Sequence, residues 1–257
     1  MTAKLLVGTY EKGGGGGLTP LHQSASGWTA GEPVSAIRNA SWGVRSRQRE
    51  LWYFVDEQNG RVNVHAAGDF QQLASVASGG EAPCHLALDP TEEHLAVANY
   101  ESGSVALFRL TSDGLPVEPA AIHQNKGSGP NPERQAGPHA HWVGFADKRL
   151  YSVDLGADCI FAFSLGTGSD LSRADTAYTA PPGSGPRHLA FHPSAPIAWL
   201  VSELASTLTV LRREESGALA ALHTISTLPA GVTGESLGGA IALNRAADRL
   251  YVSNRGH

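Results

Sequence analysis

The sequence is poor in cysteine, in positive charge and in long apolar runs, and each shortage argues against a class of protein. The two cysteines, Cys84 and Cys159, show no metal-type spacing, so neither a disulfide framework nor a zinc site is indicated. A net charge of −5 gives no electrostatic case for nucleic acid or an anionic membrane as a partner. No segment is apolar for long enough to span a bilayer, and MTAKLLVGTY at the N-terminus lacks the apolar core of a signal peptide. We therefore expect a cytoplasmic protein that uses neither a metal nor another cofactor.

Turn-forming residues, by contrast, are abundant. The chain contains 30 glycines and 15 prolines, which divide it into short apolar runs. Short apolar runs between turn formers are typical of strands rather than helices. The five consecutive glycines at 13–17 are expected to form a flexible loop, because glycine restricts its own backbone so little.

One stretch, residues 184–213, recurs along the chain. Residues 81–110 match it without a gap at an offset of 103, and residues 136–165 match it with a one-residue deletion. In successive copies the second strand begins at Leu5, Trp52, Leu95, Leu150, Ala198 and Leu250. These positions are 47, 43, 55, 48 and 52 residues apart. All-β units of about 40–50 residues are typical of β-propeller blades. The sequence therefore predicts an all-β fold, with residues 1–257 forming a single β-propeller domain. An ordinary β-sandwich would not explain why a polar break such as Ser202-Glu203 follows the same strand in each copy.

Two columns of residues are expected to meet at one rim of the propeller, because the second strand of a blade ends where its antiparallel first strand begins. The residue just after each second strand is small and polar, which is typical of a turn. The next position has no such uniform character and holds Tyr10, Glu57, Tyr100, Leu155, Glu203 and Arg255. The first strands begin at His85, His141 and His188, with Arg187 beside the last. A rim with this mixture of acids, bases and aromatics predicts a small-molecule site.

Each of these residues also has an ordinary structural explanation. A single histidine at a strand start is more often a structural hydrogen-bonding residue, and an isolated pair of Glu203 with Arg255 would be a weak surface ion pair. Their convergence on one rim favours function instead. We predict that substrate is bound by Tyr10, Glu57, Tyr100, His85 and His188.

Several motifs in the sequence carry a family resemblance. They are VGTY at Val7, VANYESGSV at Val97, PNPERQAGPHAH at Pro130, YSVDLG at Tyr151, GPRHLAFHP at Gly185, VSE at Val201 and YVSNRGH at Tyr251. Together they resemble the lactonase family of seven-bladed β-propellers, which includes 6-phosphogluconolactonases of the propeller type and the 3-carboxy-cis,cis-muconate lactonizing enzyme. The resemblance covers the whole chain, and it implies an active site made of His141, Arg187, Glu203 and Arg255.

The resemblance also implies that something is missing at the C-terminal end. Members of the family continue past the NRGH motif with more blade sequence, on the order of 80 residues for blades of the expected length. We therefore expect a propeller truncated to about five and a half blades, the last of which begins at Ser236. Such a chain should form an open arc with a gap between Arg255 and Tyr10.

The activity implied by the resemblance is metal-independent hydrolysis of a sugar lactone. The substrate would be a small lactone bearing a phosphate or carboxylate, such as 6-phosphogluconolactone of the pentose phosphate pathway. Glu203 or His141 is the candidate base, and Arg187 or Arg255 is the candidate partner of the oxyanion. The alternatives are a muconate-type lactonizing cycloisomerase and a non-catalytic binding scaffold, although the Trp-Asp dipeptide of WD40 scaffolds does not occur.

Overall fold

Antiparallel strands and the turns between them make up the protein. The computed structural model describes residues 4–165, 170–171, 173–232 and 234–256. Within these ranges every element is a strand except one 3-10 turn, η1 (Glu11–Gly13), so the predicted all-β class is confirmed. The same ranges hold no helix that is long and apolar enough to cross a membrane.

The strands form six sheets, each made of consecutive strands. The four-stranded sheets are β4 (Gly43–Arg45), β5 (Leu51–Asp56), β6 (Arg61–Ala66) and β7 (Gln72–Ala77); β8 (Pro83–Leu88), β9 (His94–Asn99), β10 (Ser104–Leu110) and β11 (Pro116–Gln124); β12 (Ala140–Ala146), β13 (Arg149–Asp154), β14 (Cys159–Ser164) and β15 (Ala174–Thr179); and β16 (Pro186–Phe191), β17 (Ile197–Ser202), β18 (Thr207–Arg213) and β19 (Leu219–Ser226). The smaller sheets are β1 (Lys4–Val7), β2 (Thr19–Ser24) and β3 (Gly27–Ala30), and the pair β20 (Leu237–Leu243) and β21 (Leu250–Arg255). All six predicted second strands are present, as β1, β5, β9, β13, β17 and β21.

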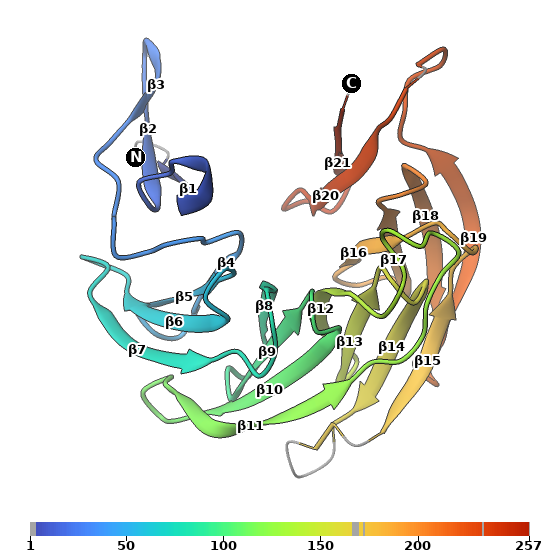
Figure 1. Cartoon of the computed structure of the whole chain (residues 1–257), viewed down its shortest axis with the longest axis horizontal. Helices are drawn as coiled ribbons and strands as arrows, with labels where there is room; N and C mark the ends of the chain where they lie inside the picture. Colours follow the sequence, from blue (N-terminus) through green and yellow to red (C-terminus); the bar gives the residue numbers. More distant parts are fainter. Residues whose placement is uncertain (1–3, 166–169, 172, 233, 257) are drawn as a thin grey trace.

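The sheets are arranged as blades around a common centre. In Figure 1 they form an open arc, with β1–β3 at one end and β20–β21 at the other. The first strand of each four-stranded sheet lies toward the centre and the fourth at the periphery. The glycine run expected to be a flexible loop instead forms a compact turn, in which Gly17 N–H donates to Thr9 Oγ1 and the Thr9 hydroxyl donates to Gly17 O.

The apolar core lies between neighbouring sheets rather than in one central mass. Tyr53 of β5 and Phe108 of β10 are buried in the same cluster, which joins two adjacent blades. Tyr151 of β13 and Leu200 of β17 belong to an equivalent cluster between the next two blades along the arc. Because the four-stranded blades are covered on both faces, their inner strands are apolar on both sides and carry little two-residue alternation. Stacked blades of this kind hold the inner strand ends in fixed positions.

A β-bulge interrupts the first strand of three blades near its start. At each bulge one extra residue stands between two paired positions, and these extra residues are Cys84, His141 and Arg187. In β20 the register is also irregular, between Gly238 and Ile241. A bulge changes the direction of the side chain that it carries. All three bulged side chains line the cavity described next.

The bulges correct one part of the sequence alignment. The sequence alignment places His85, His141 and His188 at one equivalent position. In the structure His141 is equivalent to Cys84 and Arg187, whereas His85 and His188 share the next position with Trp142. The one-residue deletion in the alignment hid this shift.

Candidate active site

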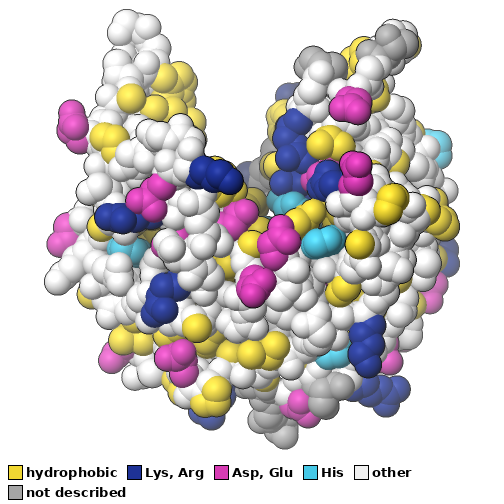
Figure 2. All heavy atoms as spheres, in the orientation of Figure 1, with side chains coloured by type: hydrophobic (Ala, Val, Ile, Leu, Met, Phe, Trp, Pro, Cys, Tyr) yellow, Lys and Arg dark blue, Asp and Glu magenta, His cyan; other side chains and the backbone are white. Residues whose placement is uncertain are grey.

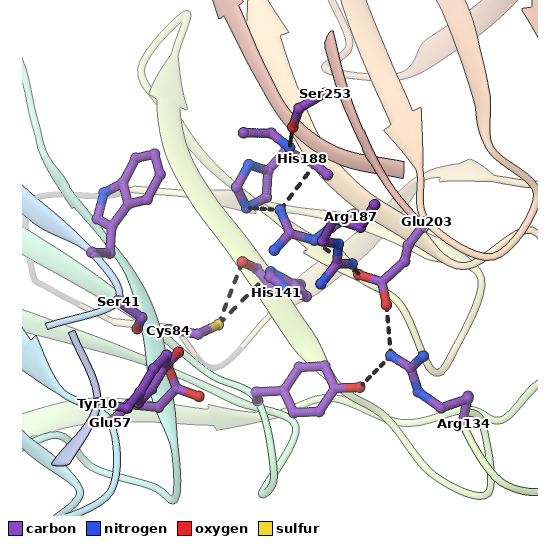
Figure 3. A pocket seen from close by; sticks show the side chains of 15 residues that line it. Tyr10, Ser41, Glu57, Cys84, Arg134, His141, Arg187, His188, Glu203 and Ser253 are labelled. Atoms are coloured by element: carbon purple, nitrogen blue, oxygen red, sulfur yellow. Dashed lines mark hydrogen bonds and ion pairs between the residues drawn. The ribbon is translucent and has the colours of Figure 1, made fainter. Parts of the chain in front are cut away.

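The bulged residues and the ends of the second strands surround one cavity of about 420 Å³ (Figure 3). Eight of the nine predicted site residues line it: Tyr10, Glu57, Tyr100, His141, Arg187, His188, Glu203 and Arg255. Figure 2 shows the corresponding hollow between the two ends of the arc, with dark blue and cyan side chains on its C-terminal flank. The prediction that His141, Glu203 and Arg255 share one end of the propeller is therefore confirmed.

The most heavily bonded group in the cavity is the carboxylate of Glu203, which follows β17. Arg134 Nη2 lies 2.7 Å from its Oε1, Arg187 Nε lies 2.8 Å from its Oε2, and Arg255 Nη2 lies 2.7 Å from the same Oε2. The Glu203 side chain is only 3% exposed, so these contacts are shielded from water. One carboxylate among three guanidinium groups leaves two net positive charges on this side of the cavity. We call these four residues the arginine wall.

The arginine wall keeps Glu203 ionised. Burial on its own would raise the pKa of this carboxyl group. The hydrogen bond from Arg134 and the charges of Arg255 and Arg187 outweigh burial and hold the pKa below its usual value. Glu203 is therefore an anion at neutral pH, and both of its oxygens are engaged.

Arg187 is fixed by three partners from three elements. Besides Glu203, its Nη1 donates to the carbonyl of Gly239 at 3.0 Å and to His188 Nε2 at 3.1 Å. A guanidinium can only donate, so Nε2 of His188 must accept and this ring is neutral. Burial, assisted by the charge of Arg187, lowers the pKa of His188 well below its usual value. His188 thus touches the cavity but also positions Arg187.

His141 presents a neutral imidazole beside the arginine wall. Burial, followed by the nearby charge of Arg187, lowers its pKa to about 3. Its Nδ1 lies 3.9 Å from the thiol sulfur of Cys84, whose own pKa is raised by burial. Among the described residues no group hydrogen-bonds to Nε2 of His141, so this nitrogen is available to a ligand.

A layer of aromatic rings lies at the position after the bulges. The His85 ring lies against Trp42 at a centroid distance of 4.1 Å, tilted by 31°, and it contacts Trp142 and His188 at 5.5 and 5.4 Å. His85 is 3% exposed and is absent from the cavity lining. It is the one predicted site residue that the structure leaves out of the cavity. The bulge explains this, because the bulged Cys84 side chain, and not that of His85, lines the cavity at this position.

The opposite side of the cavity is acidic and phenolic. The Tyr10 hydroxyl, from the segment after β1, donates to Glu57 Oε2 at 2.7 Å, and Glu57 directly follows β5. Burial, together with this bond, raises the pKa of Tyr10 to about 12. We call Tyr10 and Glu57 the acceptor wall.

The comparisons with known proteins agree with this geometry. The family described as "Lactonase, 7-bladed beta-propeller" matches residues 4–257. The chain belongs to this lactonase family. It is 30% identical over 262 residues to the 6-phosphogluconolactonase of Bacillus subtilis, which covers 98% of this chain and 74% of the relative.

Solved structures give the same result. The periplasmic gluconolactonase of Pseudomonas aeruginosa superposes with a TM-score of 0.89 at 28% identity, covering 100% of this chain and 77% of that one. A protein from Lactobacillus plantarum superposes with a TM-score of 0.87 at 29% identity, covering 100% and 76%. This member of the family therefore spans about three quarters of the length of these relatives.

Sequence reasoning missed Arg134, although it noticed the long loop that carries it. The loop 125–139 joins two blades, and Arg134 Nη2 reaches both Tyr100 Oη at 3.2 Å and Glu203. Its place in the PNPERQ segment next to PHAH was the available signal. Within the described residues no group of three or more His, Cys, Asp or Glu is arranged to hold a metal ion. Independence from metals stays a prediction.

Proposed function

We propose that this protein hydrolyses a sugar lactone, with 6-phosphogluconolactone as its substrate and 6-phosphogluconate as its product. The observation that carries the proposal is a buried carboxylate among three arginines beside a neutral imidazole with a free nitrogen, all in one cavity. The names of the relatives in Bacillus subtilis and Pseudomonas aeruginosa support the reaction class.

The arginine wall suits a substrate that carries a phosphate or a carboxylate. The negative charge of Glu203 offsets one of the three guanidinium charges, so two net positive charges remain for the substrate. Guanidinium groups bind such anions through paired hydrogen bonds. Arg255 is 50% exposed and Arg187 is 16% exposed, so Arg255 meets an incoming anion first. Arg187 lies deeper, next to His141, where the carbonyl would sit.

We assign the role of general base to His141 rather than to Glu203. Both oxygens of Glu203 already contact guanidinium groups, so neither oxygen is free to take a proton from water. His141 is neutral and has a free nitrogen. The charge of Arg187 contributes to its low pKa, so an anionic substrate that offsets this charge raises the pKa of His141 toward the working pH, where a general base is most effective.

The proposed reaction needs only these side chains and one water. His141 takes a proton from water as the water oxygen attacks the lactone carbonyl, and Arg187 donates to the oxyanion. When the tetrahedral intermediate collapses, the ring C–O bond breaks and protonated His141 returns the proton to the leaving alkoxide. General base catalysis is worth about 10²–10⁴ in rate, and a well-aimed oxyanion donor about 10²–10³.

The proposal also includes location in the cytoplasm and a single propeller domain over residues 1–257.

The direct test is an assay with 6-phosphogluconolactone, corrected for its spontaneous hydrolysis, on wild type and Glu203→Gln. The variant removes the anion that aligns three guanidinium groups, and we expect kcat/KM to fall by about 10²-fold or more. Glu214→Gln is the matched control, because Glu214 pairs with Arg212 at 3.3 Å on the exposed surface of the same blade.

Glu203 is buried, so its substitution is also expected to lower stability. Arg255→Gln provides a second variant at a half-exposed position and is expected to raise KM without unfolding the protein. Wild-type protein without activity above the spontaneous rate would overturn the proposed function.

A further inference from the structure

The acceptor wall has a chemistry opposite to that of the arginine wall, and the proposed mechanism does not use it. Figure 3 shows Tyr10 and Glu57 across the cavity from Arg187 and Glu203. Both come from the first two sheets of the arc, whereas the arginine wall comes from the later blades and the loop that carries Arg134. The three arginines that line the cavity all contact Glu203. In the described parts of the chain, no Lys or Arg pairs with Glu57.

The bonding of Glu57 leaves it able to accept more hydrogen bonds. A carboxylate offers about four lone-pair sites, and Tyr10 fills one of them. Tyr10 is the one side chain among the described residues that bonds to the Glu57 carboxylate. The raised pKa of Tyr10 keeps its hydroxyl protonated, with its proton directed at Glu57 Oε2. Glu57 lines the cavity, and its Oε1 accepts no hydrogen bond from the described chain.

We propose that Glu57, oriented by Tyr10, is a specificity-determining residue that selects a polyhydroxylated lactone and rejects one with a carboxylate in place of the hydroxyl groups. The inference rests on the proposed function and deepens it. A substrate with an anionic group on the arginine wall places its far end toward Glu57. Ring or side-chain hydroxyl groups there donate to the carboxylate, whereas a second carboxylate meets a like charge.

The size of the selection follows from the chemistry of buried polar groups. A site that hydrogen-bonds a substrate hydroxyl discriminates strongly against analogues that lack it, because its own polar group is then left without a partner. Hydrogen bonds to a charged group contribute about 10- to 150-fold in a binding or rate constant. Like charges brought together across an interface add to the discrimination. The two lactonase-family substrate types named above, sugar lactones and carboxylated muconate lactones, differ at this point.

The test compares two lactones on two variants. The kcat/KM for 6-phosphogluconolactone and for 3-carboxymuconolactone, which has two carboxylates and no hydroxyl group, is measured for wild type, Glu57→Gln and Tyr10→Phe. We expect Glu57→Gln to lose about 10- to 100-fold on 6-phosphogluconolactone and to lose nothing on 3-carboxymuconolactone, so the ratio between the two collapses. Tyr10→Phe keeps the carboxylate and is expected to lose less than about 10-fold. Glu81→Gln, an acid outside the cavity lining, is the matched control.

Binding measurements separate this inference from the proposed function. Titration calorimetry with 6-phosphogluconate and with cis,cis-muconate needs no turnover. If wild type hydrolyses no lactone, the proposed function fails, while a 10- to 100-fold loss of affinity in Glu57→Gln for 6-phosphogluconate alone still supports the role of Glu57. An equal loss for both ligands, or no loss for either, in a variant that unfolds like wild type would overturn it.

Discussion

The two walls of the cavity differ in how firmly they are held. On the arginine wall, Glu203 is 3% exposed, contacts three guanidinium groups, and follows a strand of a four-stranded blade covered on both faces. On the acceptor wall, Tyr10 is 42% exposed, its hydroxyl donates to Glu57, and it follows a strand of the three-stranded sheet at the end of the arc. The comparison teaches that rigid, cross-linked charges suit a reaction that needs fixed geometry. A looser wall suits selection among ligands.

The largest difference between the walls is expected in stability. Leu200 of β17 is 1% exposed beneath the arginine wall, whereas Leu5 of β1 is 52% exposed near the acceptor wall. Leu200→Ala should lower the free energy of unfolding by about 2–5 kcal/mol, because it leaves a cavity between two blades. Leu5→Ala should cost less than about 1 kcal/mol. Urea denaturation measures both changes, and equal losses would show that the two walls are supported alike.

Activity should divide between the walls in the same direction. Arg187→Ala removes the donor next to His141, and kcat is expected to fall by about 10²–10³-fold. Tyr10→Phe removes one hydroxyl group from the looser wall and should cost less than about 10-fold, mainly in KM. Steady-state kinetics on 6-phosphogluconolactone checks the order. A larger loss of kcat for Tyr10→Phe than for Arg187→Ala would place the reaction on the acceptor wall and contradict this prediction.

Acid should destabilise the protein through the buried histidines on the arginine side. The pKa of His141 is lowered to about 3 and that of His188 is also lowered, so the unfolded chain binds protons near pH 6.5 that the folded chain does not. Stability contributed in this way is present above about pH 6.5 and is lost as the pH falls below it. Each group contributes up to about 2 kcal/mol between pH 7 and pH 5.

Substituting one of these rings isolates its share of the pH dependence. His188→Gln should flatten the fall in unfolding free energy between pH 7 and pH 5 by up to about 2 kcal/mol. His223→Gln, on the exposed part of β19, is the matched control. The same slope in wild type and His188→Gln would contradict the burial argument. Tyr10 on the acceptor wall, with its pKa raised to about 12, does not titrate in this range.

The smallest effect is expected from metal removal. Both walls act through side chains, and the described residues include no cluster suited to a metal ion. Treatment with a chelator should leave kcat/KM unchanged within error. Activity that is lost with the chelator and returns with zinc would contradict this prediction.

Much of this arrangement was predictable from the repeat. The recurrence of the second strand located Tyr10, Glu57, Glu203 and Arg255 at one rim, because equivalent strands of successive blades end at the same rim. The bulges were not predictable, since an inserted residue shows in the sequence only as a shift in a two-residue alternation, and these doubly covered strands carry little alternation. For this reason the sequence alignment assigned to His85 the cavity position that Cys84 occupies.

The loop residue and the division into two walls also lay beyond the sequence. Arg134 stands in a loop without periodicity, so neither strand pattern nor repeat indicates where its guanidinium group lies. The sequence showed acids and bases at the same rim but not which pairs meet. The pairing depends on the order of the blades around the arc, which brings Glu203 to Arg255 and Tyr10 to Glu57.

The central claim is that His141 is the base of a lactonase site, and one kinetic measurement tests it most directly. The kcat for 6-phosphogluconolactone is determined for His141→Asn beside His139→Asn, a control in the same motif whose ring stacks on Tyr100 at 4.5 Å and does not line the cavity. We predict a fall in kcat of about 10²–10⁴-fold for His141→Asn with little change in KM, and less than about 10-fold for His139→Asn. A His141→Asn variant that keeps the kcat of wild type would contradict the account.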